Sequence, residues 1–159
     1  MSMLKHIMKS LLLAFGSNLG DRQQTLEDAY IEIGKLPDTE LVCVSRFYET
    51  KPVGGPAGQP DYLNAAGIIK TRCSPHELFN QLRAIELQFG RIRKERWGAR
   101  TLDIDILLCE NEIIETPELF IPHKEMLNRE FVLLPASEIA PDWIHPVSNL
   151  TIRQHLELL

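Results

Sequence analysis

Two carboxylates one residue apart are the feature of this sequence with the clearest chemical meaning. Asp103 and Asp105 alternate with the apolar residues Leu102, Ile104 and Ile106. On a β-strand, residues i and i+2 point the same way, so the two carboxylates would share one face about 7 Å apart. Like charges this close favour a cation between them, and Mg²⁺ takes one or two carboxylates plus phosphate oxygens and waters. An exposed strand face with plain polar alternation explains the same spacing equally well.

A cationic run precedes this pair in a chain whose formal net charge is −5. Its basic residues are Arg91, Arg93, Lys94, Arg96 and Arg100. A solvated surface run is the usual explanation of such a cluster. Beside a two-carboxylate metal site, however, guanidinium groups and Mg²⁺ together neutralise a triphosphate, and this combination indicates phosphoryl-type transfer.

Two further features belong to the same basic segment or to its neighbourhood. Trp97, next to Gly98, fits either an aromatic lid over a flat ligand or a core anchor. The chain has neither a Walker phosphate loop nor a kinase glycine-rich motif, so a bound nucleotide would be held in another way. The segment 16–21 is best interpreted as a strand-to-helix connection in which Asp21 caps the helix.

Composition limits the class of protein. The chain has 159 residues, of which 44% are hydrophobic and 25% charged, as expected for one globular domain over 1–159, with 1–9 a dispensable extension. No apolar run approaches the roughly 20 residues of a membrane helix, and the negative charge argues against a general nucleic-acid binder. Cys43, Cys73 and Cys109 form no C-x-x-C pair, so we expect buried thiols in a reducing, cytoplasmic location.

The elements that must position these residues follow from periodicity and turn signals. Strands are predicted over 11–15, 41–48, 62–71 and 102–108, the last paired with a short strand at 113–114. Helices are predicted over 22–36, from the cap Ser74 to Gly90, around 131–137 and over 151–159. A proline- and glycine-rich loop at 51–60 is too long for a tight hairpin, which suggests a functional role.

The order of these elements predicts the fold class. Strand–helix–strand occurs twice, followed by shorter elements, which is typical of an α+β ferredoxin-like plait in a single domain. In that fold an antiparallel sheet has helices packed on one face. A doubly wound parallel sheet is less consistent with the chain, because two strands adjoin without a helix between them.

Several dispersed motifs resemble one enzyme family, the hydroxymethyldihydropterin pyrophosphokinases. They occur in the family's order over nearly the whole chain, at 15–22, 48–54, 59–65, 96–107 and 139–141. The most specific is the segment from Arg96 to Leu107, which contains both aspartates. The resemblance implies a ferredoxin-like fold and the transfer of diphosphate from ATP to the 6-hydroxymethyl group of a reduced pterin. The products would be AMP and the pterin diphosphate, an intermediate of folate biosynthesis.

The resemblance also implies a role for each matching residue. Asp103 and Asp105 would hold two Mg²⁺ ions, and Arg91 and Arg100 would be catalytic by neutralising charge as AMP leaves. The residues that would contact ATP are Glu86, Arg93, His123 and Arg129. Those that would bind the pterin are Thr50, Val53, Tyr62, Asn64, Trp97 and Phe131. Ala99, where the family usually has proline, and Lys124 depart from the family pattern.

The expected partners are small molecules, namely ATP and a reduced pterin, and we expect a monomer with no nucleic-acid or membrane partner. Two other classes remain open at the level of sequence. In a two-metal nuclease or phosphodiesterase the same aspartates would activate water, but the negative net charge disfavours this class. A non-catalytic nucleotide-binding relative is disfavoured because Asp103, Asp105, Arg91 and Arg100 are all present.

Overall fold

The computed structural model describes residues 7–51, 57–90 and 102–159. Five residues with expected roles lie outside these ranges: Arg91, Arg93, Trp97, Arg100 and Val53. Within the described ranges the elements are β1 (Lys9–Ser17), α1 (Arg22–Gly34), β2 (Thr39–Val44), β3 (Tyr48–Thr50), β4 (Tyr62–Thr71), α2 (Pro75–Gln88), β5 (Asp103–Cys109), β6 (Ile114–Glu115), β7 (Phe120–Ile121), the 3-10 helix η2 (Met126–Asn128), α3 (Glu130–Ile139) and α4 (Ile152–Glu157).

The main sheet is antiparallel, with strand order β2-β4-β1-β5 and with β3 added beside β4. β1 and β4 pair along their whole lengths, from Lys9 opposite Thr71 to Ser17 opposite Leu63. Lys9, at the end of the expected N-terminal extension, is therefore part of the sheet. α1 connects β1 to β2, and α2 connects β4 to β5, each pair being separated by one strand. This arrangement is the predicted ferredoxin-like plait.

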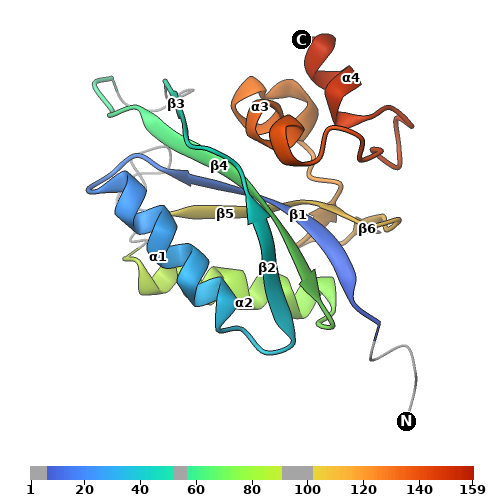
Figure 1. Ribbon diagram of the computed structural model, residues 1–159, viewed down its shortest axis with the longest axis horizontal. Helices are drawn as coiled ribbons and strands as arrows, with labels where there is room; N and C mark the ends of the chain where they lie inside the picture. Colours follow the sequence, from blue (N-terminus) through green and yellow to red (C-terminus); the bar gives the residue numbers. More distant parts are fainter. Residues whose placement is uncertain (1–6, 52–56, 91–101) are drawn as a thin grey trace.

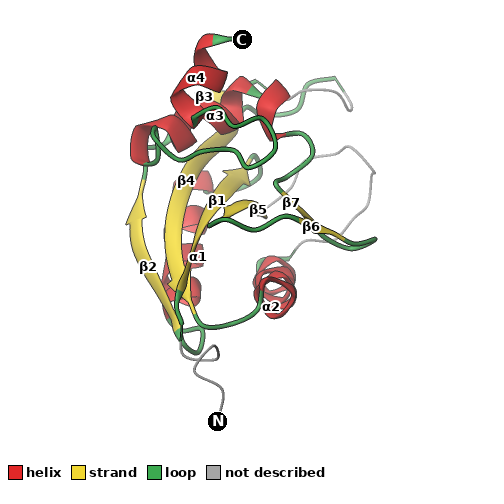
Figure 2. Ribbon diagram, turned by 90° about the vertical axis from the view of Figure 1, so that its right-hand side faces the viewer, coloured by secondary structure: helices red, strands yellow, loops and turns green. Residues whose placement is uncertain are grey.

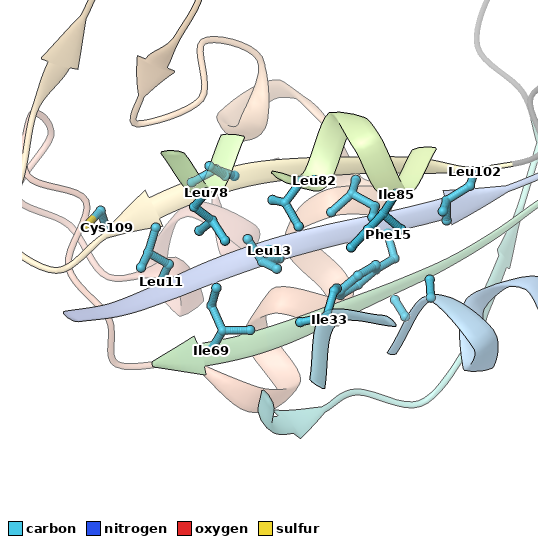
Figure 3. Close-up of a cluster of buried hydrophobic side chains, with 14 of the residues drawn as sticks. Leu11, Leu13, Phe15, Ile33, Ile69, Leu78, Leu82, Ile85, Leu102 and Cys109 are labelled. Carbon is cyan, nitrogen blue, oxygen red and sulfur yellow. The ribbon is translucent and has the colours of Figure 1, made fainter. Parts of the chain in front are cut away.

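Helices cover both faces of the sheet. α1 and α2 lie on one side, while α3 and α4 lie on the other (Figures 1 and 2). Figure 3 shows Leu11, Leu13 and Phe15 of β1 packed among side chains of α2 and α1. The expectation of helices on one face is wrong because the central strands are apolar on both sides. Leu12, for example, is fully buried in a second core beneath α3.

The two long helices begin where the capping residues predict. Ser74 accepts a hydrogen bond from the Glu77 N–H at 3.2 Å, and Asp21 accepts one from Gln24 at 3.2 Å. Gly90, which follows α2, has a φ of +76°, a left-handed conformation that glycine adopts without a Cβ penalty. α1 ends at Gly34, two residues before the predicted end.

Two strand predictions need correction. The single strand expected over 41–48 is divided, because Ser45 leaves the ladder and bonds to Ala66 of β4 through both its backbone and its hydroxyl. The strand at 113–114 does not pair with β5. Ile114 pairs instead with Ile121 of β7, since the outer edge of β5 is occupied by the His123 N–H, which donates to the Leu107 carbonyl at 2.9 Å.

The three cysteines are free thiols in different environments. Cys109 is buried, and burial raises the pKa of its thiol to about 12. Cys73 is half-buried, whereas Cys43 is exposed, so the expectation of three buried thiols is wrong for Cys43. The cause is its place on the edge strand β2, where the register shifts between Leu41 and Cys43. Among the described helices, none combines the length and the apolar character that crossing a bilayer demands.

Candidate active site

One transverse row of residues crosses four strands of the sheet on the α3 side. Tyr48 of β3 is opposite Asn64 of β4, Asn64 is opposite Gly16 of β1, and Gly16 is opposite Asp103 of β5. Residues directly opposite one another point to the same face. Because neighbouring strands lie about 4.8 Å apart, Asn64 and Asp103 are separated by roughly 10 Å at the backbone. The row thus brings a neutral amide and a carboxylate to one surface.

The centre of this row has a floor of small residues. A Cβ at Gly16 would lie 3.3 Å from Asn64 Oδ1 and 3.5 Å from Tyr62 Cδ1. Asn64 and Tyr62 therefore lean over Gly16, and the missing side chain lets them do so. In the adjacent row, Ala14 lies between Ala66 and Asp105, again with only methyl groups at the centre. On this face, β1 therefore has only small residues between β4, which carries the Asn64 amide (the amide side), and β5, which carries the two carboxylates (the carboxylate side).

The amide side of the site is held by one hydrogen bond. Asn64, whose exposed fraction is 5%, donates from Nδ2 to Thr50 Oγ1, and Thr50 is opposite Tyr62 in the β3–β4 pair. An amide has two donor hydrogens and an acceptor oxygen, so this bond fixes its orientation while leaving further capacity. The structure thus brings Thr50, Tyr62 and Asn64 together on the face where Asp103 and Asp105 lie.

The carboxylate side is formed by the first half of β5. Asp103 and Asp105 are half-buried on the α3 side, whereas Ile104 and Ile106 are buried in the core on the other side. This is the alternation that the sequence predicted. In the parts of the chain that the structure describes, no three His, Cys, Asp or Glu side chains gather into a metal-holding group.

Two more expected residues lie at the α3 end of this face. His123 Nδ1 accepts a hydrogen bond from the Glu125 N–H at 3.2 Å, so the neutral ring carries its proton on Nε2. Its backbone is bound to Leu107, two residues beyond Asp105 on β5. Arg129 immediately precedes α3, and its Cζ lies 5.6 Å from the centre of the Phe131 ring. Phe131 packs against the second core, beneath α3.

The family model for 7,8-dihydro-6-hydroxymethylpterin-pyrophosphokinase (HPPK) matches residues 12–141 of the chain. The chain belongs to this family. The predicted resemblance is thereby confirmed.

Curated relatives extend this likeness across most of the chain. The 2-amino-4-hydroxy-6-hydroxymethyldihydropteridine pyrophosphokinase of Haemophilus influenzae is 48% identical over 143 residues, covering 90% of this chain and 89% of the relative. The corresponding Bacillus subtilis protein is 45% identical over 127 residues, with coverage of 80% and 75%. In the bifunctional protein FolKE of Lactococcus lactis subsp. cremoris, the match is 44% identical over 83% of this chain and 38% of the relative. An HPPK domain thus occurs both in short chains and in longer ones.

Solved structures support the fold. The HPPK-DHPS of Plasmodium falciparum with pteroate has a TM-score of 0.75 and 16% identity, and it matches 96% of this chain and 42% of that chain. An HPPK-DHPS in complex with substrates has a TM-score of 0.73 and 14% identity, with coverage of 96% and 43%. This chain spans less than half of those longer chains, and at such identities the likeness concerns the fold alone.

Glu86 approaches β5 from the face opposite to Asp103 and Asp105. It is on α2 and is 1% exposed. Its Oε2 accepts from the Ile104 N–H at 2.8 Å, and its Oε1 is 3.1 Å from the Arg83 guanidinium. Its expected contact with ATP stays a prediction. Its hold on the strand between the two aspartates is observed.

The sequence did not reveal every residue that shapes the HPPK site. Gly16 was interpreted as part of a turn, yet it lies within β1 at the centre of the row. Glu138 of α3 binds Arg46 and Tyr48, which are 92 and 90 residues away along the chain. Spacing in sequence gives no signal for a contact of this range. For Gly16 the sequence offers one clue, its position directly after the apolar run 11–15.

Proposed function

We propose that this chain transfers the β,γ-diphosphate of ATP to the hydroxymethyl oxygen of 6-hydroxymethyl-7,8-dihydropterin, as a step of folate biosynthesis. The hydroxymethyl oxygen forms a bond to the β-phosphorus. The bond from that phosphorus to the oxygen shared with the α-phosphate breaks, so AMP leaves with that oxygen and the hydroxyl proton passes to solvent. The observation that carries this proposal is the row from Asn64 through Gly16 to Asp103, which supports a heterocycle site and a phosphate site on one surface.

The pterin is assigned to the amide side of the row. The edge of a pterin ring presents donors and acceptors side by side, and Asn64 offers both kinds of group in a fixed orientation. Thr50 and Tyr62 border the same place, and Phe131 supplies an aromatic surface from α3. Val53 and Trp97 complete the proposed set from outside the described residues. Together these groups would align the hydroxymethyl oxygen for in-line attack.

The triphosphate is assigned to the carboxylate side. Asp103 and Asp105 fit Mg²⁺ because they are adjacent carboxylates on one face of β5, and carboxylate oxygens are ligands that Mg²⁺ takes. When bound, two Mg²⁺ ions would neutralise part of the negative charge on the triphosphate. His123 and Arg129 would contact the nucleotide, and Glu86 would keep β5 in place beneath it.

The basic residues outside the described ranges complete the nucleotide assignment. Arg91 and Arg100 would neutralise charge moving toward the α-phosphate, and Arg93 would bind ATP. We further propose that the chain works as a monomer on small-molecule substrates, since every expected site residue comes from one chain. A cytoplasmic location would suit three free cysteines and an ATP-dependent reaction.

The deciding experiment identifies the nucleotide product. Purified protein is incubated with ATP, Mg²⁺ and 6-hydroxymethyl-7,8-dihydropterin, and the nucleotides are separated by chromatography. We expect AMP and the pterin diphosphate in equal amounts, with no AMP when the pterin or the metal is left out. ADP as the product, or AMP formation that ignores the pterin, would contradict the proposal.

A further inference from the structure

A carboxylate on α3 binds the segment that contains β3. Glu138 accepts hydrogen bonds from the Arg46 backbone N–H at 3.1 Å to Oε2, from Arg46 Nε at 3.2 Å to Oε1, and from the Tyr48 hydroxyl. Arg46 also donates to Tyr48 at 3.2 Å, and its Cζ lies 5.4 Å from the centre of the Tyr48 ring. These three side chains, which we call the Glu138 latch, join elements far apart in sequence.

The latch carboxylate is charged at neutral pH. Partial burial acts to raise the pKa of Glu138, but the hydrogen bonds from Tyr48 and Arg46 outweigh it and leave the pKa below its ordinary value. The Tyr48 hydroxyl is therefore the donor. Hydrogen bonds to an ionised acceptor are stronger than neutral ones, and Glu138 accepts them from both Arg46 and Tyr48 although the latch lies at the surface.

The latch acts on the strand that borders the amide side of the site. β3 has three residues, and within the described chain it pairs only with β4. Such a short edge strand has few ladder bonds to fix it. Tyr48 is opposite Asn64, and Thr50, two residues further, accepts the Asn64 hydrogen bond. A second attachment, from Arg22 to Glu49 at 2.8 Å, holds β3 toward α1 and not toward α3.

The other end of the latch belongs to the helix that carries the aromatic group of the site. Phe131 lies seven residues before Glu138 on α3, which corresponds to about 10 Å along the helix. Figure 1 shows β3 beside α3 on the upper side of the sheet. The latch thus bridges the two elements that border the proposed pterin position.

We propose that Glu138 is a positioning residue for the pterin: through Tyr48 and Arg46 it sets the spacing between β3 and α3, so that the Thr50–Asn64 pair and Phe131 meet the ring together. The inference rests on the proposed function, because it takes the pterin site to be where Asn64 and Phe131 lie. It assigns to Glu138 an effect on pterin binding that is separate from nucleotide binding, since Asp103 and Asp105 are held by β5 and not by β3.

The test compares steady-state kinetics of Glu138→Ala and Glu138→Gln with the unaltered protein. Glu138→Ala should raise KM for the pterin about ten-fold, as the loss of charge-assisted hydrogen bonds implies, while KM for ATP changes less than two-fold. Glu138→Gln keeps an acceptor oxygen for Tyr48 or Arg46 and should recover part of the loss. Equal increases in both KM values, or a lower melting temperature with unchanged KM values, would overturn the proposal.

Two further variants keep the test decisive. Asp142→Asn removes an exposed ion pair with Arg153 (2.9 Å), and as a matched control it should leave both KM values unchanged. If Glu138→Ala does not fold, Tyr48→Phe removes one hydroxyl only and should raise the pterin KM in the same direction; an unchanged value would then overturn the proposal.

Asn64→Ala tests the proposed pterin site independently of the positioning role of Glu138. If Asn64→Ala raises the pterin KM and Glu138→Ala does not, the positioning role fails while the proposed pterin site stands. If Asn64→Ala leaves the pterin KM unchanged, the proposed site itself is wrong, and the positioning role fails with it.

Discussion

At the scale of single residues, the two aspartates of β5 should dominate activity. Replacing Asp105 by Asn keeps the shape of the side chain and removes its charge, so a bound cation loses one anionic ligand. We expect kcat to fall roughly 100-fold or more, with an unchanged circular dichroism spectrum and melting temperature. Glu110→Gln, which removes an exposed carboxylate just beyond the same strand, serves as control and should keep full activity.

Gly16 should matter for a different reason, namely space. A Cβ at this position would lie 3.3 Å from Asn64 Oδ1, so Gly16→Ala must push the amide away from its present place. We expect the KM for the pterin to rise about five-fold, because small displacements of a positioning group weaken binding and alignment. Gly34→Ala is the matched control, since its Cβ would meet nothing within 4 Å. An unaltered pterin KM in Gly16→Ala would show that Asn64 does not bind the ring.

A site residue could be predicted from the sequence where its role depends on neighbouring positions in the chain. The spacing of Asp103 and Asp105 within an apolar alternation predicts that both lie on one face of a strand, and β5 has them there. The contribution of Gly16 depends on a neighbour 48 positions away, Asn64, whose position is set by strand pairing. Pairing register arises from the whole sheet, so no local pattern could have disclosed it.

At the scale of elements, β5 is an edge strand whose attachment to α2 can be tested. Glu86→Ala would remove the acceptor of the buried Ile104 N–H and leave that group unsatisfied, which costs about 1–3 kcal/mol of unfolding free energy. Denaturant titration should show this loss. Glu77→Ala, an exposed carboxylate on the first turn of the same helix, should change stability by less than about 0.5 kcal/mol.

The kinetic constants of Glu86→Ala distinguish a structural role of Glu86 from a contact with ATP. If Glu86 serves the strand alone, the change to Ala should lower kcat through displaced aspartates and leave KM for ATP nearly unchanged. A selective increase in KM for ATP would instead support the nucleotide contact that the family resemblance implies.

Elements with strong local signals were predicted well. β4 has the predicted bounds, Tyr62–Thr71, because it is a continuous β-prone run between turn residues, and α2 begins at its predicted cap. The division of β2 from β3 and the pairing of β6 with β7 were not predicted. Both depend on contacts made from outside, those of Ser45 with Ala66 and of His123 with Leu107. Tertiary contacts decide such short strands, and propensity does not.

At the scale of the whole molecule, the expectation of helices on one face of the sheet missed the layer that α3 and α4 form on the other face. The sequence places apolar residues at consecutive positions in β1, Leu11 to Leu13, which indicates burial on both sides. This run of apolar residues is visible in the sequence, and it argues against a plait in which helices cover only one face of the sheet. This layer carries Phe131, which we propose to bind the pterin, and Glu138, which we propose to position it.

The attachment of this layer should make the stability of the molecule depend on pH. His145, in the segment that links α3 to α4, is 6% exposed, and its Nδ1 accepts hydrogen bonds from the backbone N–H groups of Val147 (3.3 Å) and Ser148 (3.2 Å). Burial, with a smaller contribution from the nearby His155 ring, lowers the pKa of His145 below its ordinary value of 6.5. Protonation of Nδ1 would break both bonds.

The sign of the effect follows from linkage. As pH falls below 6.5, the unfolded chain takes up a proton at His145 while the folded chain does not, so the free energy of unfolding decreases until the lowered folded pKa is reached. One group contributes a slope of at most about 1.4 kcal/mol per pH unit. The pKa values of Glu112 and Glu138 are also lowered, but from 4.5, so their contribution is lost only at more acidic pH.

Urea titrations at several pH values between 7.5 and 5 would measure this slope, and His145→Gln identifies its source. Gln keeps an acceptor oxygen near the Val147 and Ser148 N–H groups but cannot titrate, so the variant should lose part of the slope that the unaltered protein shows. An identical slope in the two proteins would mean that His145 is protonated as readily in the folded chain as in the unfolded one, and that the α3–α4 layer is not the acid-sensitive part of the molecule.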